Sequence, residues 1–148
     1  MMDLHVDDAG FVRAPAPLVY RRLTDIRRWP TWWPGCRILD RGVPGEERFL
    51  VELTPGIGRR LRVAATPGDW RHEHGFGLTL TGDLDGRAEF WLEHLPAGTV
   101  VHHLLVARTP RSRPQTVLRD HRRAIRRGLW GLKDALQVEA RTSAGLQP

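Results

Sequence analysis

The stretch RPQTVLRDHRRAIRRGLWGLKDALQVEAR, from Arg113 to Arg141, decides the fold of this chain. When its residues are spaced at about 100° around a helix axis, the large apolar side chains share one stripe and most arginines lie opposite. The stripe contains Leu118, Ile125, Leu129, Leu132 and Leu136, with His121 and Gly128 at its edge. This pattern predicts one long amphipathic helix over residues 113–141. Such a helix needs an apolar partner, and the preceding sequence offers a sheet.

Strand patterns fill most of the chain before this helix. Residues 3–13 alternate weakly and predict a first strand, and residues 36–108 predict six more. The clearest is ERFLVELT, where Phe49, Val51 and Leu53 alternate with polar residues. Turns containing Gly or Pro separate the strands, and PGDW at 67–70 is one of them. Strands at this spacing predict an antiparallel meander.

Two short helices are predicted between the first strand and the meander. The second contains Trp29, Trp32 and Trp33, and Pro30 and Pro34 keep it short. Because two tryptophans are adjacent, we expect at least one of Trp32 and Trp33 to be partly exposed. The element order predicts an α+β fold of two layers in a single domain over residues 1–148. One helix covers a broad curved sheet incompletely, so we expect a cleft between them.

Composition sets limits on function. The 41% apolar and 27% charged residues are ordinary for a globular protein. The net charge of +6 comes from arginine, since Lys133 is the only lysine. These arginines are spread along the chain and cover the outer face of the last helix, so we interpret them as a solvated face and not as a nucleic-acid site.

Targeting patterns are missing from the sequence as well. No apolar run reaches the roughly 18 residues of a membrane span, and the first residues do not have the pattern of a signal peptide. The lone Cys36 excludes an internal disulfide and a cysteine-built metal site. We therefore expect a cytoplasmic protein.

Three segments together resemble a known family. RAPAPLVYRRLTDIRRWPTWWPG at 13–35 contains an alanine-proline helix start followed by D-x-x-x-W-P-x-W-x-P. GDLDGRAEFWLEHLPAGTVVHHLL at 82–105 contains a G-x-x-x-G turn, a strand with a central Trp and a G-T-x-V strand. The last helix adds a late G-L-x-x-L at 128–132. This order resembles START-like proteins (the SRPBCC superfamily) of the polyketide cyclase/dehydrase and lipid-transport family.

The resemblance implies the helix-grip fold, in which a seven-stranded antiparallel sheet wraps a long C-terminal helix and encloses an elongated cavity. It implies binding of a hydrophobic or aromatic small molecule, lipid-like or polyketide-like, between sheet and helix. The alternative is an aromatase/cyclase that folds a poly-β-ketone chain, which shaping of the substrate alone can promote. A third hypothesis is an interaction module whose basic surface binds an acyl carrier protein or nucleic acid. Fold alone does not choose among them.

The candidate ligand-binding residues are the apolar and aromatic side chains expected to face the cleft, together with one histidine. They are Trp29, Trp33, Phe49, Val51, Phe76, Leu78, Phe90, His121, Ile125, Gly128 and Leu129. Tryptophan offers a large flat apolar surface for an aromatic ligand. Gly128 leaves space either for ligand or for close packing against a strand.

The sequence contains no recognisable set of catalytic residues, but two histidines are candidates for general acid–base chemistry. His74 shares a strand face with Phe76 and Leu78, and His121 lies beside the apolar stripe. One of His102 and His103 must point inward, and the sequence does not say which. In the strand 87–95, either Phe90, Leu92 and His94 face inward, or Trp91 does with two glutamates.

The sequence predicts no metal site and no cofactor. P-loop, dinucleotide-binding, nucleophile-elbow and zinc-protease motifs are all missing. Trp130 falls among the arginines on the outer helix face, which suggests a homodimer contact or stacking under Arg126 or Arg127.

Overall fold

The computed structural model describes residues 3–42, Gly45 and residues 47–145. The seven strands are β1 (Asp3–Val12), β2 (Cys36–Asp40), β3 (Phe49–Leu53), β4 (Leu61–Arg71), β5 (Gly75–Gly82), β6 (Asp85–Leu95) and β7 (Gly98–Arg108). The helices are α1 (Ala16–Thr24), the 3-10 turn η1 (Ile26–Arg28), α2 (Trp29–Trp32) and α3 (Pro114–Gly145).

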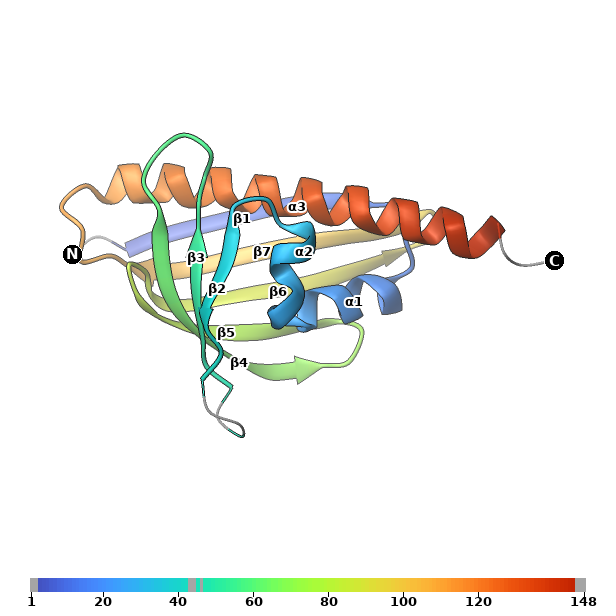
Figure 1. Cartoon of the computed structure of the whole chain (residues 1–148), viewed down its shortest axis with the longest axis horizontal. Helices are drawn as coiled ribbons and strands as arrows, with labels where there is room; N and C mark the ends of the chain where they lie inside the picture. The colour runs from blue at the N-terminus through green and yellow to red at the C-terminus, as the bar shows by residue number, and fades with distance from the viewer. Residues whose placement is uncertain (1–2, 43–44, 46, 146–148) are drawn as a thin grey trace.

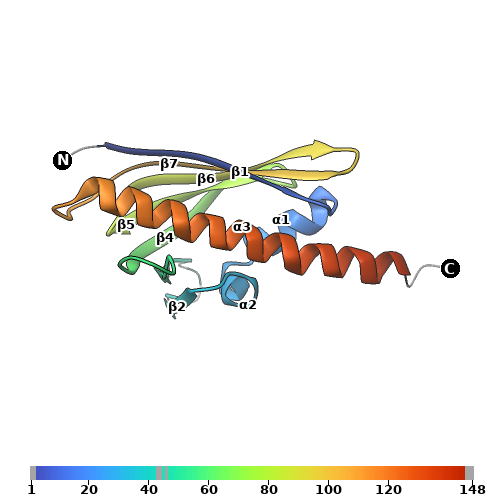
Figure 2. The same cartoon turned by 90° about the horizontal axis from the view of Figure 1, so that it is seen from above.

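One antiparallel sheet contains all of these strands, in the order β1-β7-β6-β5-β4-β3-β2. Helix α3 crosses its concave face, and α1 and α2 lie on the same side (Figure 1). In Figure 2 the sheet curls so that β1 and β2, its two edge strands, lie on opposite sides of α3. The predicted helix-grip fold is confirmed.

The interior face of α3 follows the predicted stripe. Ile125, Leu132 and Leu136 are fully buried, and Leu118 and Leu129 at its margin are partly buried. The helix packs closely on the edge strand β1, where a Cβ at Gly10 would lie in van der Waals contact, 3.4 Å from the Cβ of Leu129.

The register of β6 and β7 settles which side chains face inward. Phe90 pairs with His103, and both are buried against α3. Trp91 and His102, the next pair, face outward, where their rings stack with centroids 3.8 Å apart. Phe90 and Leu92 therefore take the inward positions, which is the first of the two predicted registers, although His94 at its end is exposed.

Strand β4 is longer than predicted. Residues 67–70, expected to be a turn, continue the strand to Arg71, with a register shift between Gly68 and Arg71. The reason is that β3 pairs only with residues 61–65 of β4. Beyond that point β4 pairs with β5 alone and is an edge strand, a position where proline is tolerated.

Candidate ligand-binding site

A small apolar cavity lies between the sheet and α3. Its volume is about 40 Å³. It is lined by Trp29, Trp33, Val51, Leu53, Val63, Ala65, Leu78, Leu80, Leu84, Ala88, Phe90, His103, His121 and Ile125. These residues come from α2, from β3 to β7 and from α3, with Trp33 just after α2 and Leu84 between β5 and β6, so both layers of the fold form its wall.

The tryptophan segment, residues 29–33, closes one side of this cavity. The expectation that Trp32 or Trp33 would be exposed is wrong, since they are 6% and 4% exposed. The indole N–H of Trp29 donates to the carbonyl of Leu23 at 2.8 Å, and that of Trp33 donates to the carbonyl of Ala124 at 2.9 Å. These bonds satisfy both donors, so the two rings present only apolar surface to the cavity.

Two glycines of α3 explain how two adjacent tryptophans are buried. A Cβ at Gly128 would lie 2.5 Å from the Trp33 ring, and a Cβ at Gly131 would overlap the carbonyl of Trp32. The tryptophan segment therefore packs directly on the helix backbone. Of the two predicted roles for Gly128, close packing is the one observed, although the partner is Trp33 and not a strand.

A pair of buried histidines is the polar feature of the cavity wall. His103 of β7 and His121 of α3 are 2% and 3% exposed, and their Nε2 atoms are 3.1 Å apart. The His103 ring also lies against Phe90, with centroids 4.7 Å apart. Neither Nδ1 atom has a hydrogen-bond partner among the described residues.

Burial keeps both imidazoles neutral. Desolvation lowers the pKa of His121 to about 4. The same cause, with a smaller effect of His121, holds the pKa of His103 well below its ordinary value. Because burial disfavours the charged form, the pair is neutral near pH 7.

The predicted ligand-binding residues fall into three groups. Trp29, Trp33, Val51, Leu78, Phe90, His121 and Ile125 line the cavity. Gly128 and Leu129 line a neighbouring void of about 10 Å³ with Trp32, Trp33, Phe90 and Ile125. Phe49 and Phe76 are buried outside both spaces, and Phe76 stacks between Trp70 and Phe90.

His74 does not point inward, so that prediction is wrong. It is exposed and stacks on His94, with ring centroids 4.7 Å apart. The turn at residues 72–74 ends the strand alternation before it reaches this histidine. His103 is the inward histidine that the sequence left undecided, and only the pairing with β6 decides it.

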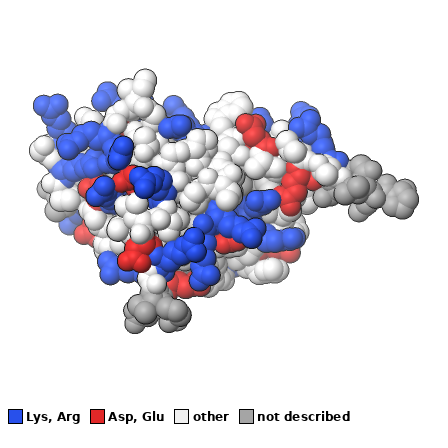
Figure 3. Space-filling view, viewed as in Figure 1, with Lys and Arg blue, Asp and Glu red and all other residues white. Residues whose placement is uncertain are grey.

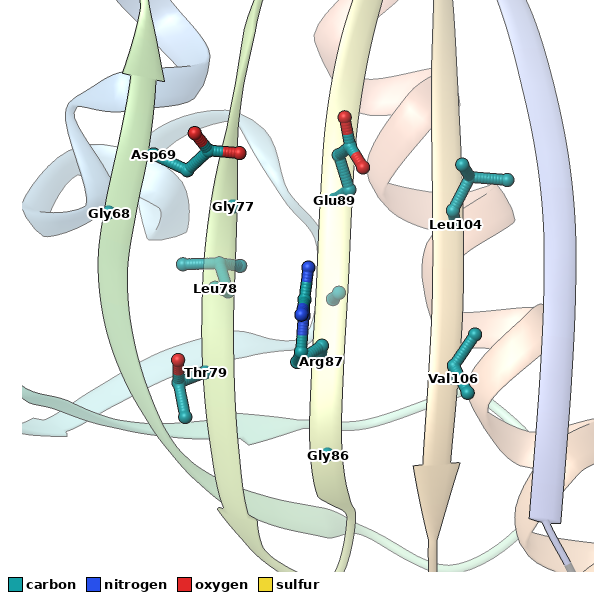
Figure 4. A pocket seen from close by; sticks show the side chains of 11 residues that line it. Gly68, Asp69, Gly77, Leu78, Thr79, Gly86, Arg87, Glu89, Leu104 and Val106 are labelled. Carbon is teal, nitrogen blue, oxygen red and sulfur yellow. The ribbon is translucent and has the colours of Figure 1, made fainter.

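A larger hollow lies on the opposite face of the sheet. Its volume is about 630 Å³, and Gly68, Gly77 and Gly86 form part of its floor. Figure 4 shows Asp69, Arg87 and Glu89 standing on this outer face, with α3 behind the strands. Four of its eleven lining residues, Asp69, Thr79, Arg87 and Val106, are exposed, and charged side chains stand among them, so it lacks the mostly apolar wall that small-molecule sites usually have.

Charges lie outside the cavity. Glu52 on the outer face of β3 is 1% exposed because Arg37, Arg60 and Arg62 cover it, and the Arg62 Nε donates to it at 2.8 Å. That hydrogen bond is the main cause that lowers the pKa of Glu52. Basic side chains are spread over the face in Figure 3 with acidic ones among them.

Three further expectations concern features outside the cavity. Lys133, not Arg126 or Arg127, is the cation over Trp130, with its Nζ 4.9 Å from the ring centroid. Among the described helices, none is both long and apolar enough to cross a membrane. Within the same residues, no three His, Cys, Asp or Glu side chains group closely enough to hold a metal ion.

Comparison with known structures identifies the class of fold. A START superfamily protein from Mycobacterium smegmatis matches with a TM-score of 0.70 at 18% identity, over 90% of this chain and 97% of that one. A protein from Thermus thermophilus gives a TM-score of 0.74 at 16% identity, over 92% of this chain and 99% of that one.

An aromatase/cyclase is also similar in structure. The Zhui aromatase/cyclase from Streptomyces sp. R1128 gives a TM-score of 0.63 at 18% identity, over 95% of this chain and 94% of that one. No family model matches the sequence. No curated protein matches it either. The chain has the START-like fold.

Proposed function

We propose that this protein binds a hydrophobic or aromatic small molecule in the cavity between the sheet and α3. The observation that carries the proposal is the cavity wall, which both layers build almost entirely from apolar side chains. Ligand sites are mostly apolar and contain few polar groups, and here the polar groups are His103 and His121. The START-like fold supports the same proposal, because the resemblance to this family implies a cavity between the sheet and the long helix.

Binding must enlarge the cavity. Its volume of about 40 Å³ is well below the roughly 150 Å³ that accommodates benzene in an engineered protein cavity. The tryptophan segment is the wall that we propose moves, and its movement breaks the hydrogen bonds from Trp29 to Leu23 and from Trp33 to Ala124. It contains a helix of only four residues, and outside that helix few backbone hydrogen bonds hold it.

A titration with toluene tests this proposal. Ala65 lines the cavity and Ala64, the preceding residue of β4, faces the other way. Ala65→Leu fills the space, so we expect its affinity for toluene to fall at least tenfold, as measured by calorimetry. Ala64→Leu is the matched control and should bind within about twofold of the unchanged protein. Equal binding by all three proteins, or no binding by any, would sink the proposal.

An aromatase/cyclase is the second candidate, and the buried histidine pair is the observation that favours it. An aldol closure requires that a base take a proton from the carbon next to a ketone, and the neutral pair is such a base, made weaker by its lowered pKa values. Heptane-2,6-dione is a simple test substrate, since it closes to an aldol and loses water to give 3-methylcyclohex-2-enone. We expect the protein to accelerate enone formation, followed by absorbance, and His121→Leu to abolish the effect. The same rate with and without protein would exclude this function for that substrate.

The finer predictions about partners and location stay proposals. They are a lipid-like or polyketide-like ligand, an acyl carrier protein on the basic surface, a homodimer through α3, and a cytoplasmic, bacterial setting. Trp130, at 63% exposure, supports the dimer. Light scattering after size exclusion tests it, because Trp130→Ser should lower the mass from that of two chains to that of one.

A further inference from the structure

We infer that the ligand carries one neutral hydrogen-bonding group, a hydroxyl or a carbonyl, which pairs with the His103–His121 pair while the rest of the molecule stays apolar. This inference rests on the proposed function and specifies the class of ligand. It is carried by the position of the two rings, by their unpaired nitrogens and by the chemistry of the remaining wall.

The two rings belong to the cavity wall from opposite layers. His103 projects from β7 and His121 from α3, and both are more than nine-tenths buried. The bond between their Nε2 atoms uses one nitrogen of each ring. The two Nδ1 atoms are buried and have no partner in the described part of the chain, and the empty cavity exposes neither of them, so a ligand reaches an Nδ1 atom only as the cavity enlarges, which the proposed function already requires. An unpaired buried polar atom costs about 1–3 kcal/mol, so a ligand that pairs with it recovers part of that cost.

The number of protons on the two rings determines which hydrogen-bond donors and acceptors the pair offers to a ligand. Each neutral imidazole carries one N–H, so the pair has two hydrogens on four nitrogens. One hydrogen lies between the two Nε2 atoms. The ring that donates it has a bare Nδ1, which accepts, and the other ring must carry its hydrogen on Nδ1, which donates. The pair therefore presents one acceptor and one donor, and either tautomer of the pair gives the same set.

This set fits hydroxyl and carbonyl groups. A hydroxyl can donate to the bare Nδ1 or accept from the protonated one, and a carbonyl can accept from the protonated one. A purely apolar ligand would leave both atoms unpaired.

Charged ligands are excluded by the rest of the wall. Among the described residues, those that line the cavity include no Arg, Lys, Asp or Glu. A carboxylate would enter without a counter-ion, and burying an unpaired charge is far more costly than burying a neutral polar group. The arginines around Glu52 do not change this, because they lie on the outer face of the sheet.

Three probes of nearly equal size separate these cases: toluene, phenol and benzoate. Binding is measured by calorimetry at pH 8 for the unchanged protein and for the double variant His103→Leu/His121→Leu. Replacing both partners of a buried hydrogen bond by apolar side chains is close to neutral for stability, so the double variant should fold. We expect it to lose about tenfold in affinity for phenol, the equivalent of about one hydrogen bond, and to bind toluene within about twofold. Benzoate should not bind to either protein.

The outcomes distinguish the inference from the proposed function. If neither toluene nor phenol binds to the unchanged protein, the proposed function fails. If both bind and the double variant keeps the full affinity for phenol, the inference alone fails. Binding of benzoate as tight as that of phenol also overturns it.

A second measurement keeps the inference testable if the double variant does not fold. Long-range ¹H–¹⁵N spectra of the unchanged protein report the protonation of each imidazole nitrogen. The Nδ1 resonance of His103 or His121 should shift on addition of phenol and stay unchanged with toluene. Identical spectra with both ligands would contradict the inference.

Discussion

His103 and His121 make the stability of the fold depend on pH. Both have pKa values lowered by burial in the folded state, whereas in the unfolded chain they titrate near the ordinary value of 6.5. As the pH falls below about 6.5, the unfolded state binds more protons than the folded state, so the free energy of unfolding decreases. His121 alone should lower the free energy of unfolding by about 2 kcal/mol between pH 8 and pH 5, because its folded pKa is about 4, and His103 acts in the same direction.

Urea unfolding at several pH values between 8 and 5 measures this loss. The double variant His103→Leu/His121→Leu is the control, and its stability should change much less over the same range. If both proteins lost stability in parallel, the histidine pair would not be the cause.

Gly128 gives a second prediction at the residue scale. Alanine is normally the better helix residue by about 1 kcal/mol. Here its Cβ would meet the Trp33 ring, which is itself fixed by a hydrogen bond to the carbonyl of Ala124. We therefore expect Gly128→Ala to lower the free energy of unfolding by about 1–3 kcal/mol, as overpacking does. Thermal unfolding measures it, with the exposed Arg126→Ala as control, and a rise in melting temperature would contradict the packing described.

Some residue positions could be predicted from the sequence and others could not. Alternation placed Val51 and Leu78 on the inner face, because it needs only the local strand period, but it left the strand 87–95 open between Phe90 and Trp91. It could not choose between His102 and His103, because that choice depends on how β7 pairs with β6. The burial of both Trp32 and Trp33 was missed for a similar reason, since it depends on glycines about a hundred residues later in the chain.

At the scale of elements, the long helix and the meander follow from their periodicities. The helix predicted over 113–141 is observed as Pro114–Gly145. The length of β4 could not be predicted, because Pro and Gly are residue types that favour turns. Pro67 and Gly68 lie in a strand here because they pair with β5.

The loop between β3 and β4, residues 54–60, is tied to α3. Asp120 of α3 accepts the backbone N–H of Arg59 at 3.2 Å, and Arg127 donates to the carbonyl of Thr54 at 3.1 Å. Asp120 is 1% exposed, so its hydrogen bond is shielded from water. We expect Asp120→Ala to cost about 1.5–3 kcal/mol, the range for hydrogen bonds to charged groups.

Hydrogen exchange localises this effect. The amide of Arg59 should exchange faster in Asp120→Ala, while amides in β6 and β7 keep their relative protection. Asp134→Ala, an exposed position of the same helix, is the control. Unchanged exchange at Arg59 would mean that Asp120 does not hold the loop.

At the scale of the whole molecule, one sheet grips one helix and leaves a small apolar cavity where the two layers do not fully meet. The sequence predicted this architecture because amphipathic periodicity and the order of elements leave few other packings. Seven of the fourteen wall residues were named as candidates from the sequence, whereas Leu53, Val63 and Ala65 lie on strands with equally clear alternation and were not named. The sequence did not predict the volume of the cavity, which depends on how the tryptophan segment packs on Gly128 and Gly131.

The central claim is that an apolar ligand binds between the sheet and α3. A crystal structure of the protein equilibrated with iodobenzene tests it most directly, because the iodine atom can be located by its anomalous scattering. The account predicts an iodine site inside the cavity near Phe90 and Ile125, with the tryptophan segment displaced from its position in the empty protein. Iodine only in the outer hollow beside Arg87, or at no defined site, would contradict it.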